Sequence, residues 1–192
     1  GWRGGVFFVD DNFIGNKKLL KRDLLPALIR WKKERKYSFS FNTQASINLA
    51  SDETLVTLMT DAGFETVFVG IETPNTESLI ECGKKHNVNI DLLENVNALH
   101  RSGLQVQAGF IVGFDSDGID IFQRVSAFIE QSGIVTSMVG MLNALPGTKL
   151  YKRLKREDRI IEGQTGNNTD FATNFVPRMD YTTLVEGYKR LV

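Results

Sequence analysis

Short apolar runs alternate with amphipathic helical segments along most of the chain, and this alternation limits its fold more than any other feature. The apolar runs start roughly thirty to forty residues apart. This is the repeat length of units in which a strand is followed by a crossover helix and then by the next strand. Such crossovers are right-handed and join parallel strands, so the sequence predicts an α/β fold with a parallel sheet of about five strands. The expected strands are residues 6–9, 37–43, 66–71, 105–112 and 134–142.

The segments between these strands carry apolar residues at the spacing of an amphipathic helix. The first such segment is 16–36, and Pro26 is expected to kink it. The second is expected to begin at Ser51, as its N-cap, and to end at Gly63. A closed barrel of eight units needs about 250 residues, so this chain of 192 residues leaves an open sheet, a partial barrel or a slice of a larger barrel. Further helices are expected at 75–82, 89–102 and around 121–129.

The last part of the chain has a different character. A basic helix is expected to reach Arg156, and the stretch 163–174 is rich in Gly, Asn and Thr, which is typical of a loop. Residues 181–192 show weak helical spacing. We therefore divide the chain into a β/α unit, residues 1–156, and an appendage, residues 157–192, that is loop-rich and then helical.

Composition excludes several classes of partner and site. Lys plus Arg and Asp plus Glu number 23 each, so no large electrostatic field favours nucleic acid or an anionic membrane. No apolar run approaches the roughly 18 residues of a membrane span, and the start lacks the pattern of a signal peptide, so a cytoplasmic protein is expected. Cys82, the one cysteine, excludes an internal disulfide and any cluster held by several thiolates of this chain, and it is expected to be a small buried hydrophobe.

Polar side chains gather where the expected strands end, the edge at which parallel β/α folds hold their ligands. Asp10, Asp11 and Asn12 follow the first strand, and Gln44 and Glu72 directly follow the next two. Carboxylates there could bind an ammonium group, ribose hydroxyls or a divalent cation. The alternatives are an Asx turn at the two aspartates and a solvated loop position at Glu72. A metal site of a small hydrolase is a third interpretation, which no nearby histidine or general base supports.

Four motifs occur in order at the spacing of β/α units, namely VFFVDDNF, VFVGIETP, AGFIVGF and LPGTKLY. Together they resemble the radical S-adenosylmethionine (SAM) superfamily, and within it the branch whose members often carry an N-terminal cobalamin-binding domain. The resemblance covers residues 6–156, and NTDFATNF in the tail resembles the C-terminal extension of that branch. It implies a partial (β/α) TIM-type barrel.

The resemblance also implies cofactors. In the family a loop of pattern C-x3-C-x2-C after the first strand binds a [4Fe-4S] cluster, which binds SAM and delivers the electron that cleaves it to a 5′-deoxyadenosyl radical. The first strand visible here would be the family's second, so the strand with the cysteine loop is missing, and Cys82 lies on a helix far from that place. SAM and the cluster are therefore expected in the parent protein, with cobalamin in a separate domain.

The family's site residues map onto the strand ends of this chain. Asp10, Asp11 and Asn12 would occupy the motif that contacts the SAM amino group, and Gln44 would face the pocket from the next strand. Many relatives would carry a charged side chain where this chain has Gln44.

Later strands would supply the rest of the SAM site. Glu72 would contact the ribose, and Ile111 and Gly113 would pack around the adenine. Leu142 and Pro146 would close the same side. No catalytic side chain and no metal ligand is assigned to the chain itself.

The resemblance predicts a fragment of a radical SAM oxidoreductase or methyltransferase, inactive by itself. The parent would act on a small-molecule or lipid-like substrate, with flavodoxin or ferredoxin as electron donor. The alternative is a non-catalytic interaction module that has lost its cluster. A sheet that starts at residues 6–10 also leaves an unpaired edge, which predicts self-association of the fragment or an adapted N-terminal segment.

Overall fold

The computed structural model describes residues 4–35, 39–84, 87–161 and 171–192. The chain forms two compact units, each built from several segments. The first unit comprises Gly1–Ile71, Ile90–Ala108 and Gln131–Ser137. The second comprises Glu72–Asn89, Gly109–Glu130 and Met138–Val192.

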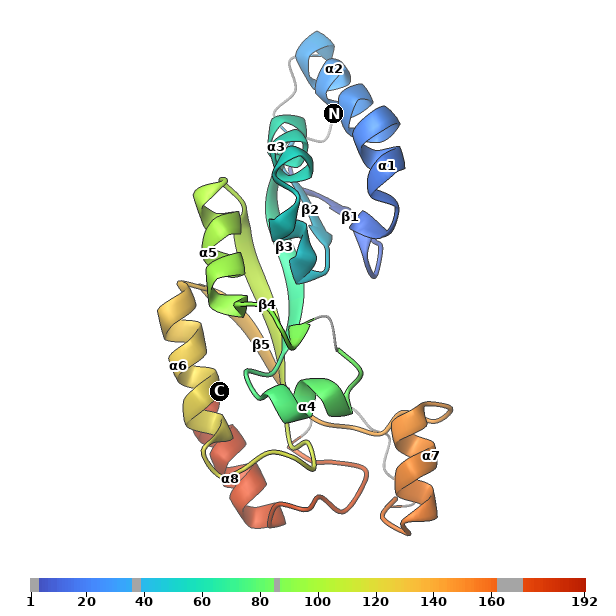
Figure 1. Ribbon diagram of the computed structural model, residues 1–192, viewed down its shortest axis with the longest axis vertical. Coiled ribbons are helices and arrows are strands. Elements are labelled where there is room, and N and C mark those ends of the chain that lie inside the picture. Colours follow the sequence, from blue (N-terminus) through green and yellow to red (C-terminus); the bar gives the residue numbers. More distant parts are fainter. Residues whose placement is uncertain (1–3, 36–38, 85–86, 162–170) are drawn as a thin grey trace. The chain divides into compact units, whose positions relative to one another are not determined.

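The strands form one open sheet of five parallel strands, in the order in which they occur along the chain (Figure 1). This confirms the predicted α/β fold, and the fourth strand matches its predicted bounds at both ends. The first strand is at an edge of the sheet, as expected. The strands are β1 (Val6–Phe8), β2 (Phe41–Gln44), β3 (Phe64–Glu72), β4 (Gln105–Val112) and β5 (Thr136–Met141).

The first long helical segment of the first unit is irregular, and the irregularity precedes Pro26. A π-helical turn, Leu20–Leu24, separates α1 (Lys17–Leu19) from α2 (Leu25–Arg35), and the N–H of Leu25 donates to the carbonyl of Leu20. Because proline has no N–H, the regular hydrogen bond to the fourth preceding carbonyl cannot form at Pro26. The predicted disturbance therefore appears as a widened turn just before the proline.

The helix after β2, α3 (Glu53–Ala62), begins at a different N-cap from the one predicted. Asp52 rather than Ser51 caps it, since Asp52 Oδ1 accepts from the N–H of Leu55 at 3.1 Å. Ser51 instead closes the preceding 3-10 turn, Ile47–Ser51. Serine and aspartate are both good N-caps, so the sequence could not decide between neighbours. Gly63 ends α3 as predicted, with a φ of 104°.

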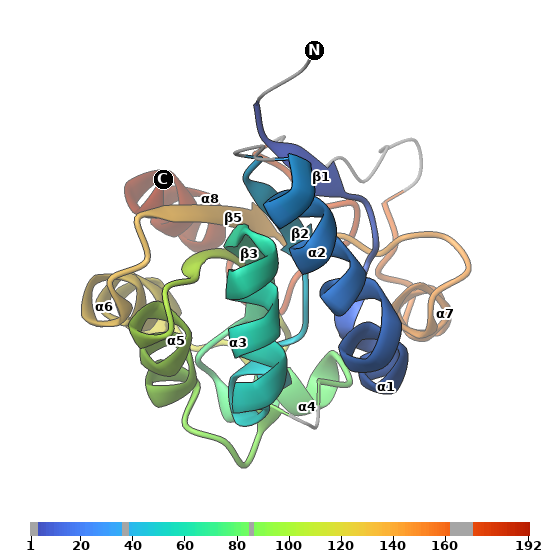
Figure 2. The ribbon, with the colours of Figure 1, turned by 90° about the horizontal axis from the view of Figure 1, so that it is seen from above.

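An aromatic cluster forms much of the core of the first unit. Phe8, Phe13, Phe41 and Phe64 lie with ring centroids 5.1 to 5.5 Å apart. The helices α2 and α3 lie side by side in this unit (Figure 2). The burial of β2 alternates, so Phe41 is buried whereas Asn42 is partly open, as a strand with one covered face requires.

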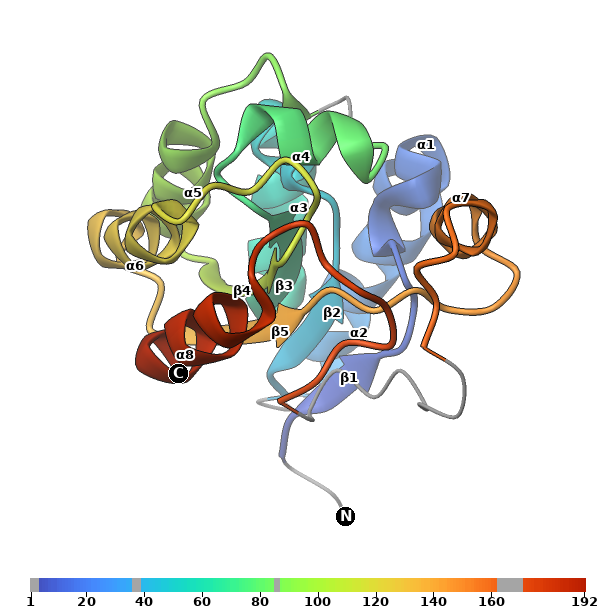
Figure 3. The same ribbon diagram turned by 90° about the horizontal axis from the view of Figure 1, so that it is seen from below.

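The second unit holds α4 (Thr76–Glu81), most of α6 (Ile121–Ser132), α7 (Lys149–Arg156) and α8 (Tyr181–Leu191). The helix α8 packs against α6 (Figure 3), where a Cβ placed on Gly187 would lie 2.2 Å from the ring of Phe122. One cluster of buried hydrophobic residues in this unit consists of Phe114, Leu142, Ala144, Leu154 and Phe175. The predicted helix at 181–192 is confirmed, whereas most of the loop predicted at 163–174 lies outside the described residues.

The remaining long helix, α5 (Leu92–Arg101), belongs to the first unit and confirms the helix expected there. No helix among the described residues is long and apolar enough to cross a membrane. The predicted division at residue 157 stays a prediction.

Candidate functional site

In the first unit, the motif after β1 leaves two carboxylates free. Asp10 and Asp11 are exposed, and their carboxylates form no hydrogen bond or ion pair with any other described residue. The cap of α1 comes from Asn16, whose side chain accepts from the N–H of Leu19 at 3.1 Å. The structure therefore contradicts the alternative in which an Asx turn at the two aspartates caps the next helix.

Asn12 has a structural contact of its own. Its Oδ1 accepts from the N–H of Ser46 at 3.1 Å and from the Ser46 hydroxyl at 3.4 Å. This joins the loop after β1 to the loop after β2. The contact fixes the backbone that carries Asp10 and Asp11, so Asn12 positions these carboxylates within the first unit.

Gln44 shares the open face of β2 with Asn42, two residues earlier. Both are half-buried, but Asn42 Oδ1 is buried and has no hydrogen-bond partner among the described residues. A buried acceptor without a donor costs on the order of 1–3 kcal/mol, so such an atom suits a donor supplied by a ligand. The sequence places Asn42 at the same strand end as Gln44, but only Gln44 was assigned to the SAM site.

In the second unit, Glu72 combines a strained backbone with an ion pair. Its φ is 68°, in the left-handed region that disfavours side chains larger than glycine. Its carboxylate lies 3.0 Å from Lys84 Nζ, and its side chain is 19% exposed. Strain of this kind concentrates at functional positions, which supports the prediction of a ligand contact here. Lys84 was not predicted.

The turn after β4 is held by a residue that sequence reasoning missed. Asp117 Oδ2 accepts from the N–H of Gly113 at 2.9 Å and from that of Phe114 at 3.0 Å. Its other oxygen accepts from the hydroxyl of Ser78 at 2.6 Å. Gly113 has a φ of 99°, which explains why glycine is needed there. An aspartate a few residues after a glycine turn was the only signal in the sequence.

A cavity of about 320 Å³ lies beside the ends of β4 and β5, within the second unit. Leu142 and Phe114 line this cavity. Ile111 does not line it but packs against the hydrophobic cluster of the second unit. Pro146 is exposed and does not line it either. Of the two residues predicted to pack around the adenine and the two predicted to close that side, only Leu142 lines this cavity. The lining residues are Glu81, Cys82, Gly83, Phe114, Leu142, Asn143, Leu145, Thr148, Lys149 and Leu150.

Cys82 is exposed at the end of α4, so the expectation of a buried hydrophobe is wrong. The short helix α4 ends there, which leaves the side chain at the cavity rim; partial burial still raises the pKa of its thiol. Among the residues that the structure describes, no three His, Cys, Asp or Glu side chains lie together as metal ligands. A [4Fe-4S] cluster needs several thiolates, so the cluster does not fit the residues of this chain.

Comparison with known proteins gives three kinds of likeness. Residues 148–192 match a family described as a domain of unknown function, DUF4070. The chain is 44% identical over 189 residues to an uncharacterized methyltransferase of Synechocystis sp., covering 98% of this chain and 35% of that protein. It is 41% identical over 172 residues to hopanoid C-2 methylase of Rhodopseudomonas palustris, covering 89% of this chain and 32% of that protein. The chain thus spans about a third of the length of these relatives.

Solved structures share the fold. The radical SAM methyltransferase TsrM from Kitasatospora setae, solved with cobalamin and a [4Fe-4S] cluster, superposes with a TM-score of 0.64 over 83% of this chain and 30% of that one, at 19% identity. OxsB, solved with aqua-cobalamin and SAM, gives a TM-score of 0.56 over 97% of this chain and 28% of that one, at 16% identity. These likenesses confirm the resemblance that the four motifs predict. Over most of its length the chain is thus similar to methylases and methyltransferases, and it shares the fold of two solved radical SAM enzymes that bind cobalamin.

Proposed function

We propose that this chain carries SAM-binding strands of a cobalamin-dependent radical SAM methyltransferase. The observation that supports this most is the 41% identity to hopanoid C-2 methylase over 89% of the chain. The relatives of known name are methylases or methyltransferases, which favours methyl transfer over the oxidoreductase alternative. They also disfavour a non-catalytic interaction module.

The two free carboxylates of the first unit suit the SAM ammonium group. Asp10 and Asp11 have no cationic partner among the described residues, and they lie on a loop fixed by Asn12. Charge-assisted hydrogen bonds from an ammonium are the contacts that such carboxylates lack. Asn42 Oδ1 offers a further acceptor on the open face of the next strand.

The second unit suits the nucleoside part of SAM. Glu72 offers carboxylate oxygens to ribose hydroxyls, and Lys84 holds that side chain in place. Leu142 contributes apolar surface to the cavity beside the ends of β4 and β5. Leu184 fills the space that a side chain on Gly113 would take, so Gly113 would shape the turn beside this surface. Ile111 and Pro146 would then support this surface rather than form the cavity wall.

The thiolates for the cluster would come from a part of the protein outside this chain. The single cysteine cannot supply them, and the relatives are about three times as long as the matched region. The chain alone would then bind SAM weakly and would not act by itself. A flavodoxin or ferredoxin would supply electrons to the complete protein, whose substrate would be a lipid-like or other apolar small molecule such as the hopanoid of its relative.

The test is anaerobic iron–sulfur reconstitution of the 192-residue chain and of the complete product of its gene, followed by visible absorbance. Mass spectrometry then follows incubation with SAM, cobalamin, reduced flavodoxin as electron donor and a hopanoid. We expect a cluster, 5′-deoxyadenosine and a methylated hopanoid with the complete product alone. A complete product that binds no cluster would refute the proposal and favour the interaction module. Cluster and 5′-deoxyadenosine without methylation would leave radical SAM chemistry but exclude hopanoids as the substrate.

A second test addresses the carboxylates. In the complete product, the double variant Asp10→Asn, Asp11→Asn should weaken SAM binding roughly tenfold or more, since a hydrogen bond to a charged group contributes about 1.5–3 kcal/mol. Asp61→Asn, an exposed acid on α3, is the matched control. Unchanged affinity in the double variant would remove these residues from the site.

A further inference from the structure

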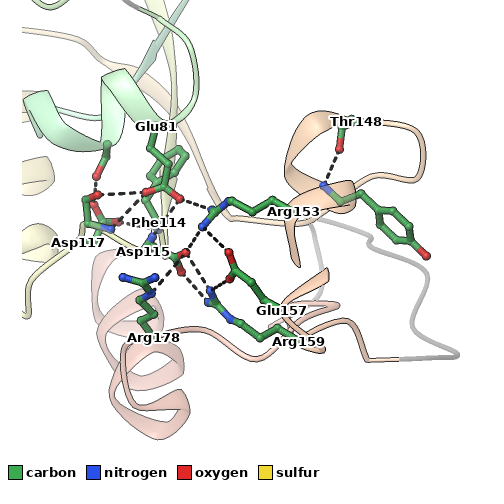
Figure 4. A network of polar contacts seen from close by, with 12 residues as sticks. Glu81, Phe114, Asp115, Asp117, Thr148, Arg153, Glu157, Arg159 and Arg178 are labelled. Carbon is green, nitrogen blue, oxygen red and sulfur yellow. Dashed lines mark hydrogen bonds and ion pairs between the residues drawn. The ribbon is translucent and has the colours of Figure 1, made fainter. Parts of the chain in front are cut away.

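Three arginines of the region matched to the family of unknown function surround one carboxylate that follows β4. Asp115, two residues after Gly113, has a side chain only 8% exposed (Figure 4). It accepts from Arg153 Nη1 at 2.6 Å and from Arg159 at 2.6 and 2.9 Å. Arg178 Nε lies 3.7 Å away on the open side. The carboxylate is thus held by guanidinium groups from α7 and from the segment after it.

The same cluster holds the end of α4. Glu81 accepts from Arg153 Nη2 at 2.8 Å and from the N–H and hydroxyl of Ser116 at 3.3 and 3.2 Å. Glu157 balances the charge of Arg159 at 2.9 Å. Three carboxylates therefore face three guanidinium groups, and the cluster is neutral as a whole (Figure 4).

Apolar and amide contacts from the same region meet the ends of β4 and β5. Leu184 of α8 lies 3.2 Å from the place where a Cβ on Gly113 would be. The side-chain amide of Asn174 both donates to the carbonyl of Ala144 and accepts from its N–H, each at 2.8 Å. The Tyr188 hydroxyl donates to the carbonyl of Val139 at 2.9 Å.

We propose that the described residues of the matched region, 148–161 and 171–192, are a positioning element for the SAM site, and that Arg153 and Arg159 act through Asp115 to set the loop 113–117. The inference rests on the proposed function. Within the loop, the Asp117 carboxylate accepts from the N–H groups of Gly113 and Phe114. From outside the loop, Arg153 and Arg159 donate to the Asp115 carboxylate. The loop is therefore fixed on both sides at the segment assigned to adenine.

The energetics favour positioning over simple stabilisation. Ion pairs taken out of water recover little net energy after desolvation, whereas bidentate arginine–carboxylate pairs fix geometry closely. Five polar contacts from Arg153 and Arg159 converge on Glu81, Asp115 and Glu157. Loss of the Asp115 charge should therefore loosen the loop, and it should also lower the stability of the unit because it leaves guanidinium groups without their partner.

The experiment uses Asp115→Asn, which keeps the shape of the side chain and removes its charge. In the 192-residue chain, amide hydrogen exchange at Gly113 and Phe114 should accelerate roughly tenfold or more, while exchange in α3 stays unchanged. In the complete product, the KM for SAM should rise about tenfold, equivalent to ~1.4 kcal/mol, with a smaller change in kcat. Glu186→Gln, which breaks an exposed ion pair on α8 in the same region, is the matched control.

The outcomes separate the two proposals. Unchanged exchange at Gly113 and Phe114 would overturn the positioning role, whether or not the protein binds SAM. Accelerated exchange with an unchanged KM would overturn the link between this loop and SAM. A wild-type protein that binds no SAM would refute the proposed function, while accelerated exchange would still support the holding of the loop. If Asp115→Asn does not fold, Arg153→Lys serves in its place. This substitution keeps the positive charge but removes the planar guanidinium group and its paired N–H donors.

Discussion

The carboxylate of Asp115 shows at the residue scale how competing effects set a protonation state. Burial disfavours its charged form, but hydrogen bonds and charges from Arg159 and Arg153 outweigh this and lower its pKa from 3.8 to about 2. The same contacts raise the pKa of both arginines. Asp115, Arg153 and Arg159 are therefore charged over the whole neutral range.

This pKa predicts an acid-sensitive second unit. A carboxyl group whose pKa is lowered by folding contributes stability above its unfolded pKa and loses it as the pH falls toward its folded pKa. The contribution of Asp115, on the order of 1–2 kcal/mol, should thus be complete above about pH 4 and lost by about pH 2. Urea unfolding of wild type and Asp115→Asn should give free energies that differ at pH 7 and converge in this window. A difference that does not change with pH would contradict the assignment.

Adjacent residues of β2 should respond in opposite ways to the loss of a polar atom. Asn42 Oδ1 is buried without a partner, so Asn42→Val should raise the free energy of unfolding by about 1 kcal/mol. Thr43 donates its hydroxyl to the carbonyl of Phe8 at 3.0 Å, so Thr43→Val should lower it by a similar amount. Thermal unfolding of the chain measures both. A destabilised Asn42→Val would show that Asn42 Oδ1 has a partner, such as water.

At the scale of elements, helix ends show what local sequence can and cannot decide. The end of α3 at Gly63 was predictable because helices commonly end with a residue in the left-handed conformation, which glycine adopts freely. Gly63 has this conformation, with a φ of 104°. The N-cap of α3 was not predictable, because serine and aspartate have similar intrinsic preferences for the N-cap position, and Ser51 and Asp52 are neighbours. The choice depends on Lys21, whose Nζ lies 3.1 Å from the Asp52 carboxylate and comes from a segment distant in sequence.

The N-cap can be tested by a matched pair of substitutions. Asp52→Ala should lower the free energy of unfolding by about 1 kcal/mol, since it leaves the N–H of Leu55 without its acceptor. Ser51→Ala should change it little, because the Ser51 side chain does not cap the helix. Urea unfolding followed by circular dichroism gives both values. Equal effects of the two changes would mean that the cap is shared.

The packing of α8 on α6 depends on one glycine. A Cβ on Gly187 would come within 2.2 Å of the Phe122 ring, so Gly187→Ala should displace α8 although alanine favours helices. Hydrogen exchange in α8 should accelerate, and Leu184 should lose its contact with Gly113. Gly15→Ala, at a position with open space around it, is the control. Unchanged exchange in α8 would show that the ring of Phe122 moves aside instead.

At the scale of the whole molecule, the fold was more predictable than the site. Strand and helix periodicities are local, so the order of elements and the parallel sheet followed from the sequence. The Arg153–Asp115 and Arg159–Asp115 contacts join residues 38 and 44 positions apart, and charged residues are too common for such pairs to be chosen without coordinates. Glu72 was identified from its place at a strand end, but its partner Lys84 and its strained backbone were not.

The open edge of the sheet predicts the behaviour of the chain in solution. β1 is an edge strand whose outer backbone groups have no neighbouring strand among the described residues, and Phe7 is 48% exposed. Edges of this kind pair with a second chain, so sedimentation should show self-association that grows with concentration. Phe7→Lys should weaken it, because a charge on an edge strand opposes pairing. Val135→Lys should not weaken the self-association, because Val135 is 83% exposed and lies outside β1, in the residue before β5. A wild-type chain that stays monomeric at every concentration would mean that this edge is protected in another way.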